Sequence, residues 1–316
     1  MKVAITGATG FIGRELVLKH LECGNSVKIL TRKSKDRLSF PSEVLIVNGD
    51  LSESVKFLQS FVKDVDVLYH CAAEILDESK MYKVNVTGTQ NLVNASSGII
   101  KHWVQLSSTG VYGKIKSGVI TESMQPDPDN VYEITKLKSD EIVAKAGVDE
   151  LFTYTILRPS NVFGKGMKNQ SLLGLIRVID QGLFAFIGQK GASANYIPVE
   201  NVVTALILCG QTQNTKGKTY ILSDHITIEL FVSTICSALN KPMPKLRISK
   251  NLVKLFNSVG QYIPHYPLSS SRIEALTNSH VYRPDLIMKE LNYRHIVTLE
   301  EGIFKLVQYY KSIKKI

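Results

Sequence analysis

A tyrosine and a lysine stand four residues apart, at Tyr132 and Lys136, in a segment whose pattern predicts a helix over 131–146. This spacing places both side chains on one face of the helix. The ordinary pKa of a phenol is about 10, so proton exchange near neutral pH requires that pKa to fall by about 3, or about 4 kcal/mol. A cation one turn away stabilises the phenolate and supplies part of this free energy. The same amine can reach the ribose of a bound cofactor.

A hydroxyl group completes the arrangement. Ser108 ends the predicted strand HWVQLSS (102–108), a few residues before Val111-Tyr112-Gly113. In that place it can hydrogen-bond the carbonyl or alcohol oxygen of a substrate. A Tyr–Lys pair taken alone is equally typical of a solvated helix surface. A dinucleotide-type turn far upstream favours the interpretation as a proton-transfer site.

That turn is glycine-rich and lies near the start of the chain. The segment GATGFIG (7–13) follows the apolar strand VAIT (3–6) and opens a predicted helix over 11–23. Glycines here let the backbone turn tightly and approach a pyrophosphate, with the anion at the helix N-terminus. The spacing is GxxGxxG, not GxGxxG. The residues predicted to bind the cofactor are Gly7, Thr9, Gly10, Phe11, Ile12 and Gly13.

The end of the second predicted strand bears on the choice of dinucleotide. An acidic residue there binds the ribose 2′-hydroxyl of NAD, whereas an arginine suits the 2′-phosphate of NADP. Here the strand ends in basic residues, Arg32 and Lys33, which favours NADP over NAD. Asp36 in the same loop could reverse this preference, and the loop could also be a solvated basic segment.

A carboxylate follows the third predicted strand, in Asn48-Gly49-Asp50-Leu51. Asp50 can accept a hydrogen bond from an adenine amino group. It can also be the N-cap of a helix that starts at Ser52, and both roles are compatible.

The elements that must position these residues alternate along the first half of the chain. The predicted strands are 3–6, 26–31, 43–50, 64–73, 102–108 and 152–159. The predicted helices are 11–23, 51–62, 80–97 and 131–146. Such alternation indicates βαβ units and an α/β fold with a doubly wound parallel sheet over residues 1–160. Residues 161–316 are predicted to form a smaller lobe, with some elements returning to the first domain. Within it, the predicted helices are 172–179, 228–239 and 249–258, a turn leads into a helix over 197–208, and 218–223 is a strand.

Taken together and in this order, the motifs resemble the extended short-chain dehydrogenase/reductase family, of the NAD-dependent epimerase/dehydratase type. The matching segments are TGATGFIG (6–13), HCAAE (70–74), NVTGT (85–89), SSTGVYG (107–113), NVYEITK (130–136), LRPSNVFG (157–164), YIPVENVV (196–203) and KELNYRHIVTLEEGI (289–303). They span nearly the whole chain. They are specific to fold and cofactor, and much less specific to substrate.

The resemblance implies a Rossmann domain, hydride transfer at C4 of a nicotinamide, and a homodimer formed through 80–97 and 132–147. It assigns catalysis to Ser108, Tyr132 and Lys136. It adds Leu51, Ala72, Ala73, Asn85 and Pro159 to the cofactor-binding residues, together with Tyr132 and Lys136. Asn161, Asn169 and Arg272 join Ser108 as substrate-binding candidates.

The resemblance also suggests a substrate class, because its most populous branch modifies nucleotide-diphosphate sugars. Two departures bear on this expectation. Ser193-Ala194-Asn195 stands where a diphosphate-binding arginine is usual, and Thr109-Gly110 replaces an acidic pair needed for dehydration. An epimerase or ketoreductase is therefore expected. The alternatives are a 3β-hydroxysteroid- or dihydroflavonol-like oxidoreductase acting on an uncharged alcohol or ketone, and a non-catalytic dinucleotide-sensing regulator. Regulators of this fold typically lack the Tyr–Lys pair.

Composition bounds the remaining possibilities. The chain has 316 residues, 44% hydrophobic and 21% charged, which excludes disordered, collagenous and coiled-coil classes. A net charge of +10 favours anionic partners, which include nucleotides, phosphates, nucleic acid and a membrane surface, and it is equally typical of a solvated lysine-rich surface. No motif supports nucleic-acid binding. The four cysteines have no metal-ligand spacing, so no metal is expected, and reduced thiols indicate a cytoplasmic protein. No signal peptide or membrane span is predicted.

Overall fold

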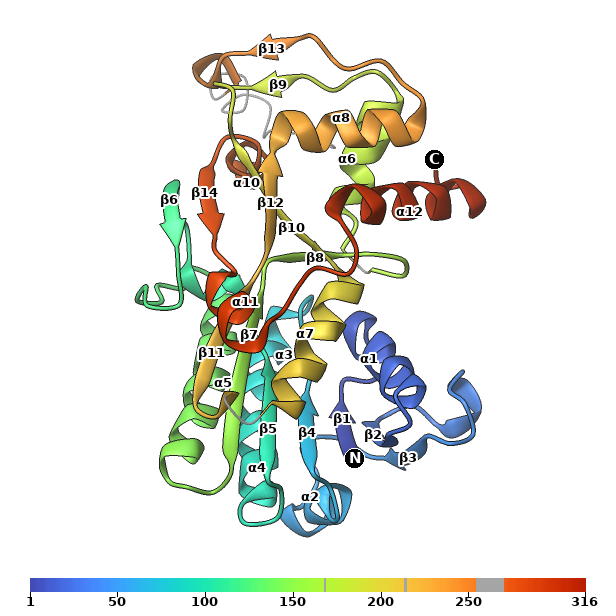
Figure 1. Ribbon diagram of the computed structural model, residues 1–316, viewed down its shortest axis with the longest axis vertical. Helices are drawn as coiled ribbons and strands as arrows, with labels where there is room; N and C mark the ends of the chain where they lie inside the picture. Colours follow the sequence, from blue (N-terminus) through green and yellow to red (C-terminus); the bar gives the residue numbers. More distant parts are fainter. Residues whose placement is uncertain (168, 213–214, 254–269) are drawn as a thin grey trace.

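A seven-stranded parallel sheet forms the centre of the computed structural model (Figure 1), in the order β11-β7-β5-β4-β1-β2-β3. The structure describes residues 1–316 except 168, 213–214 and 254–269, and for 270–272 it describes the backbone alone. The sheet strands are β1 (Lys2–Thr6), β2 (Ser26–Thr31), β3 (Leu45–Asn48), β4 (Val67–His70), β5 (His102–Leu106), β7 (Thr153–Pro159) and β11 (Lys218–Leu222). The predicted Rossmann-type α/β fold is confirmed.

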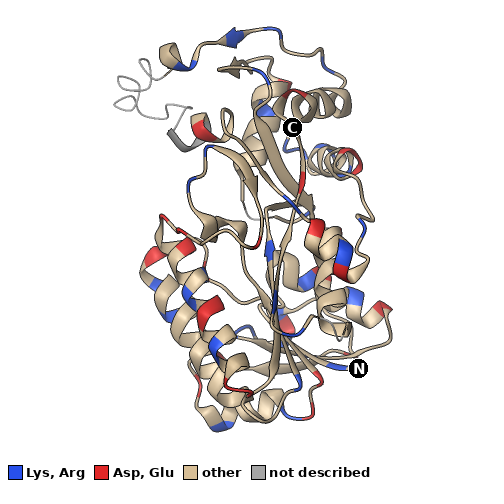
Figure 2. Ribbon diagram, turned by 60° about the vertical axis from the view of Figure 1, so that its left-hand side comes forward, with Lys and Arg blue, Asp and Glu red and all other residues tan. Residues whose placement is uncertain are grey.

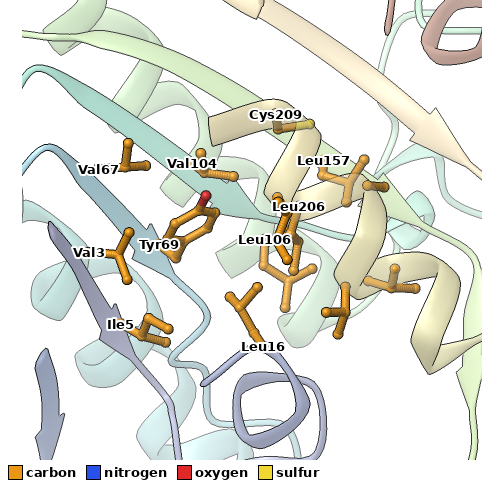
Figure 3. Packing of buried hydrophobic residues seen from close by; sticks show 14 of the residues in the cluster. Val3, Ile5, Leu16, Val67, Tyr69, Val104, Leu106, Leu157, Leu206 and Cys209 are labelled. Carbon is orange, nitrogen blue, oxygen red and sulfur yellow. The ribbon is translucent and has the colours of Figure 1, made fainter. Parts of the chain in front are cut away.

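Helices cover both faces of this sheet. They are α1 (Phe11–Glu22) and α7 (Val199–Gln211) on one face, and α2 (Val55–Val62), α4 (Gly88–Ser96) and α5 (Val131–Val148) on the other. Figure 3 shows Leu16 of α1 and Leu206 of α7 pointing at the apolar residues of β1, β4 and β5. The strands read as near-continuous apolar runs because both faces are buried.

A smaller lobe stands at the carboxyl ends of the strands (Figure 1). Its strands are β8 (Asn161–Phe163), β10 (Ser193–Pro198) and β12 (Asp224–Thr227), the pair β9 (Phe186–Ile187) and β13 (Arg247–Ile248), and the pair β6 (Ser117–Ile120) and β14 (Ser279–Tyr282). Its helices are α6 (Ser171–Asp180), α8 (Ile228–Leu239), α10 (Ser270–Ala275) and α12 (Leu299–Ser312), and α11 (Asp285–Leu291) lies beside β11. The second half of the chain thus supplies one strand of the Rossmann sheet, β11, and one helix that packs on this sheet, α7.

Several predicted elements are shorter or divided in the structure. The predicted helix 80–97 consists of α3 (Glu78–Met81), a π-helical stretch over Tyr82–Thr87, and α4. Of the predicted helix 249–258, residues 250–253 are helical and 254–258 lie outside the described residues. Within the described ranges, no helix is long and apolar enough to cross a bilayer. In the view of Figure 2, basic and acidic residues are interspersed along the helices.

Candidate active site

The three glycines of the turn between β1 and α1 have no room for a side chain. Gly7 has φ +71°, and a Cβ there would lie 2.5 Å from the amide nitrogen of Ala72. A Cβ on Gly13 would lie 2.3 Å from the carbonyl oxygen of Gly7, and one on Gly10 would lie 3.0 Å from that same oxygen. The first turn of α1 has neither a side-chain cap nor an acidic residue. These free amides and this narrow backbone fit a dinucleotide pyrophosphate.

Buried polar contacts hold the end of β4 against this turn. The Nδ1 atom of His70 lies 2.6 Å from Thr6 Oγ1, and its Nε2 atom lies 3.0 Å from Thr89 Oγ1. Burial, reinforced by the charge of Lys136, lowers the pKa of His70 to about 3, so this imidazole is neutral. The segment that contains Ala72 and Ala73 is therefore fixed beside Gly7.

Asn85 lies in the π-helical stretch and links the chain after β4 to α5. Its Oδ1 atom accepts from the Glu74 amide at 2.7 Å, and its Nδ2 atom donates to Thr135 Oγ1 at 3.0 Å. Its own carbonyl accepts from Ser139 Oγ. A π-helical turn supplies such an irregular set of partners, and turns of this kind often mark functional sites.

Arg32 and Asp50 meet beside the carboxyl ends of β2 and β3. The Nε atom of Arg32 lies 3.6 Å from Asp50 Oδ2, and the arginine side chain is 73% exposed. Asp50 Oδ1 accepts from the Ser52 amide at 2.9 Å, which closes a turn. The N-cap interpretation of Asp50 is wrong, because α2 begins at Val55 and Ser54 caps it.

Ser108, Tyr132 and Lys136 converge at the carboxyl end of β5. Ser108 follows β5 and accepts from the Gly110 amide at 3.0 Å, and its hydroxyl lies close enough to the Tyr132 phenol to lower the pKa of that group. Lys136 is 3% exposed, and its Nζ atom donates to the carbonyl of Leu106 at 2.5 Å. The three residues that the sequence motifs assigned to catalysis thus lie together in the structure.

The electrostatics of Tyr132 differ from the sequence expectation. Burial raises the pKa of Tyr132 to about 12, and the hydrogen bond from Ser108 opposes this rise only in part. Burial also lowers the pKa of Lys136, while Asp140 one turn further along α5 opposes that shift. Desolvation by the surrounding sheet and lobe is larger than the effect of a cation one turn away, which spacing alone could not reveal.

A cavity of about 370 Å³ opens beside this trio, between the Rossmann domain and the lobe. Ser108, Tyr132 and Glu133 line it from the Rossmann side. From the lobe and its connections come Ser160, Asn161, Leu175, Ser193, Ala194, Asn195, Tyr196, Ile228, Ala275, Leu276, Asn278, His280 and Tyr282, with Thr109, Gly110 and Gly113 completing the wall. Among these described residues no lysine or arginine occurs.

The three predicted substrate residues have different positions. Asn161 lines the cavity and donates to the carbonyl of Asn195 at 3.1 Å. Asn169 is exposed, accepts from the amide and hydroxyl of Ser171, and is not among the lining residues. The side chain of Arg272 lies outside what the structure describes.

Sequence reasoning missed the lobe residues that face the cavity. Asn195, His280 and Tyr282 come from β10 and β14, which have no motif linking them to Tyr132. A side-chain hydrogen bond joins the two strands, since Asn195 Nδ2 donates to the carbonyl of His280 at 2.9 Å. The signal in the sequence for Asn195 was its place in Ser193-Ala194-Asn195, where a diphosphate-binding arginine is usual in the family.

Comparison with known families decides what this arrangement belongs to. Residues 3–223 match the profile of the NAD dependent epimerase/dehydratase family. The chain belongs to this family. The matched range covers the glycine-rich turn, the Ser108–Tyr132–Lys136 trio and the return of the chain into β11. The resemblance inferred from the motifs is confirmed, and with it an NAD-dependent oxidoreductase or epimerase of the extended type.

Individual members of the epimerase/dehydratase family are distant relatives of this chain. A 3 beta-hydroxysteroid dehydrogenase/Delta 5-->4-isomerase of Mycobacterium tuberculosis is 24% identical, over 99% of this chain and 91% of that protein. A UDP-glucose 4-epimerase of Vibrio cholerae is 26% identical, over 81% of each chain. The crystal structure of UDP-glucuronic acid 4-epimerase from Bacillus cereus in complex with NAD has a TM-score of 0.78 at 20% identity, with 99% of each chain covered.

Proposed function

We propose that the protein interconverts a secondary alcohol and a ketone, with Tyr132 as the proton-transfer group. The observation that carries this proposal is the convergence of Tyr132, Ser108 and Lys136 at the carboxyl end of β5, where Ser108 and Tyr132 line the cavity. A bound nicotinamide dinucleotide would supply hydride exchange at C4. The phenolic oxygen of Tyr132 would give a proton to, or take one from, the substrate oxygen while its carbon exchanges hydride. The Ser108 hydroxyl would hydrogen-bond that same oxygen and fix its position.

The dinucleotide would be held by residues at or after the ends of β1, β2, β3, β4 and β7, together with residues of α1, the π-helical stretch and α5. These are Gly7, Thr9, Gly10, Phe11, Ile12, Gly13, Asp50, Leu51, Ala72, Ala73, Asn85, Tyr132, Lys136 and Pro159, with Arg32 and Lys33 at the adenosine end. Lys136 has a double role in this proposal. Its ammonium group would hold the nicotinamide ribose and would oppose the rise in the Tyr132 pKa.

For the substrate, we propose a nucleotide-diphosphate sugar, acted on by an epimerase or ketoreductase. Six of the thirteen residues on the lobe side of the cavity are serine, asparagine or histidine, and these side chains suit the hydroxyl groups of a sugar. The relative named UDP-glucose 4-epimerase agrees with this choice. The diphosphate would need a cation from outside the lining described above, and Arg272 remains the candidate.

An uncharged alcohol or ketone is the second candidate substrate. The absence of lysine and arginine from the described cavity lining favours it, as does the relative named 3 beta-hydroxysteroid dehydrogenase. A dinucleotide-sensing regulator is the third candidate. The complete Ser–Tyr–Lys trio disfavours this candidate.

Mass spectrometry of the ligands released from the purified protein, followed by turnover assays, tests these candidates. We expect released cofactor and turnover of UDP-glucose or its 4-keto derivative, with the cofactor retained by an epimerase and exchanged by a reductase. Turnover of the 3β-hydroxysteroid pregnenolone without turnover of the sugars would establish the second candidate. Tight cofactor binding with no turnover of either class would support the regulator.

We also propose that NADP(H) binds more tightly than NAD(H). Arg32→Ala should weaken NADPH binding by about fivefold and leave NADH binding unchanged, because the exposed guanidinium is screened by water. Fluorescence titration with both reduced cofactors measures this, and Lys101→Ala is the control, since Lys101 is an exposed cation at the amino end of β5, whereas Arg32 follows the carboxyl end of β2. Equal loss for both cofactors would exclude contact between Arg32 and a 2′-phosphate.

A cytoplasmic homodimer remains part of the proposal. The two helical segments assigned to the interface, 80–97 and 132–147, present Tyr82 at 53% exposure and Ile134 at 37%. Apolar side chains exposed on both segments support a contact between two copies through this face.

A further inference from the structure

A buried ion pair lies behind the proposed catalytic residues, and the mechanism above does not use it. Arg158, on β7, contacts Asp140 Oδ2 through Nε at 3.2 Å and through Nη2 at 3.2 Å. The two side chains are only 9% and 3% exposed. Removing two charges from water costs several kcal/mol for each ion. Because burial of this pair costs free energy, we expect the pair to have a role next to the active site.

The contacts of the pair reach both pieces of chain that carry the trio, the segment around Ser108 and helix α5. Ser107, directly before Ser108, donates its hydroxyl to Asp140 Oδ2 at 2.7 Å. Arg158 Nη1 donates to the Tyr112 hydroxyl at 3.0 Å, at the end of the short turn that Ser108 caps. Asp140 lies on α5 one turn after Lys136. The pair therefore joins β5, the turn after Ser108, and helix α5.

Asp140 differs in its effect on Lys136 from the other titratable groups around that lysine. Burial raises the pKa of the Cys71 thiol to about 12 and lowers that of His70 to about 3, so both are neutral near pH 7. Tyr132, whose pKa is also about 12, is neutral as well. Asp140 is the carboxylate that opposes the desolvation of the Lys136 ammonium, and its Oδ1 atom is buried without a hydrogen-bond partner among the described residues.

We propose that Asp140 and Arg158 are positioning residues, which fix helix α5 against the end of β5 and keep the Lys136 amine charged. Burial raises the pKa of the Asp140 carboxyl, and Arg158 is the strongest of the groups that oppose this rise and favour the carboxylate. The carboxylate in turn stabilises the ammonium. This inference rests on the proposed role of Lys136 in binding the nicotinamide ribose. It explains why a buried acid lies one turn beyond the Tyr–Lys pair.

The test is the pH dependence of NADPH and NADH binding by the full-length protein, measured by fluorescence titration. Binding should weaken at alkaline pH as Lys136 loses its proton. In Asp140→Asn this decline should move to lower pH by about 1, the effect expected for loss of one nearby charge. Lys136→Met should abolish the decline. Glu229→Gln, which breaks the 2.6 Å Glu229–Arg247 pair in the lobe, should leave it in place.

A double variant guards against misfolding. Asp140→Asn alone leaves Arg158 buried and unpaired, whereas Asp140→Asn with Arg158→Met removes both charges and should fold. The double variant should show the same displaced decline. If Lys136→Met abolishes the decline but folded Asp140 variants keep the wild-type pH dependence, the inference is overturned while the role of Lys136 stands. If Lys136→Met leaves the decline unchanged, both are overturned.

Discussion

Tyr132→Phe is expected to lower turnover by about 10²–10⁴-fold, the usual worth of a positioned proton-transfer group. The phenylalanine ring keeps the packing of Tyr132 and removes only its hydroxyl. Cofactor affinity should therefore change little, and Km should remain close to the wild-type value. Steady-state kinetics on the substrate found by the release experiment, with fluorescence titration of the reduced cofactor, measure both quantities.

Tyr309→Phe is the matched control, because Tyr309 loses the same hydroxyl on α12 and is not among the residues that line the cavity. Its kinetics should equal those of the wild type. Near-full activity of the Tyr132 variant would make Tyr132 a structural residue, and the proposed mechanism would be wrong.

Gly13→Ala is expected to weaken binding of NADH and NADPH by about tenfold to a hundredfold. The added Cβ would lie 2.3 Å from the Gly7 carbonyl oxygen, a backbone atom that can yield only if the whole turn moves. Overpacking of this kind costs about 1–3 kcal/mol. The movement would displace the amides that face the pyrophosphate, so affinity and thermal stability should fall together.

A glycine with open space around it provides the control. Gly174 lies inside α6, and a Cβ there would meet nothing within 4 Å. Gly174→Ala should therefore bind cofactor normally and unfold at an equal or slightly higher temperature. If Gly13→Ala bound both cofactors like the wild type, the turn would not be the pyrophosphate site.

The Rossmann half of the molecule was predictable because its signals are local. Strands buried on both faces are apolar along most of their length, as in residues 3–5 of β1 and 67–69 of β4, and the glycines that permit a tight turn stand between strand and helix. The positions of Ser108 and Tyr132 follow from the ends of such elements. Their roles remain proposals, but their proximity is a property of the fold.

The rest depends on contacts between distant parts of the chain. Neither the cavity wall from β10 and β14 nor the pKa of Tyr132 can be read from spacing, since both follow from how the lobe packs over the trio. The same holds for the irregular turn around Asn85, where a helix was expected. Its π-helical geometry serves partners as distant as Thr135.

The late arrival of β11 has a consequence during synthesis. A ribosome releases the chain from its amino end, so β7 emerges long before Lys218–Leu222, the strand that pairs with its outer edge. Until then β7 presents unpaired backbone amides and carbonyls, which is the situation that invites pairing with another chain. The nascent protein thus passes through a stage with an open sheet edge, and only translation through residue 222 closes it.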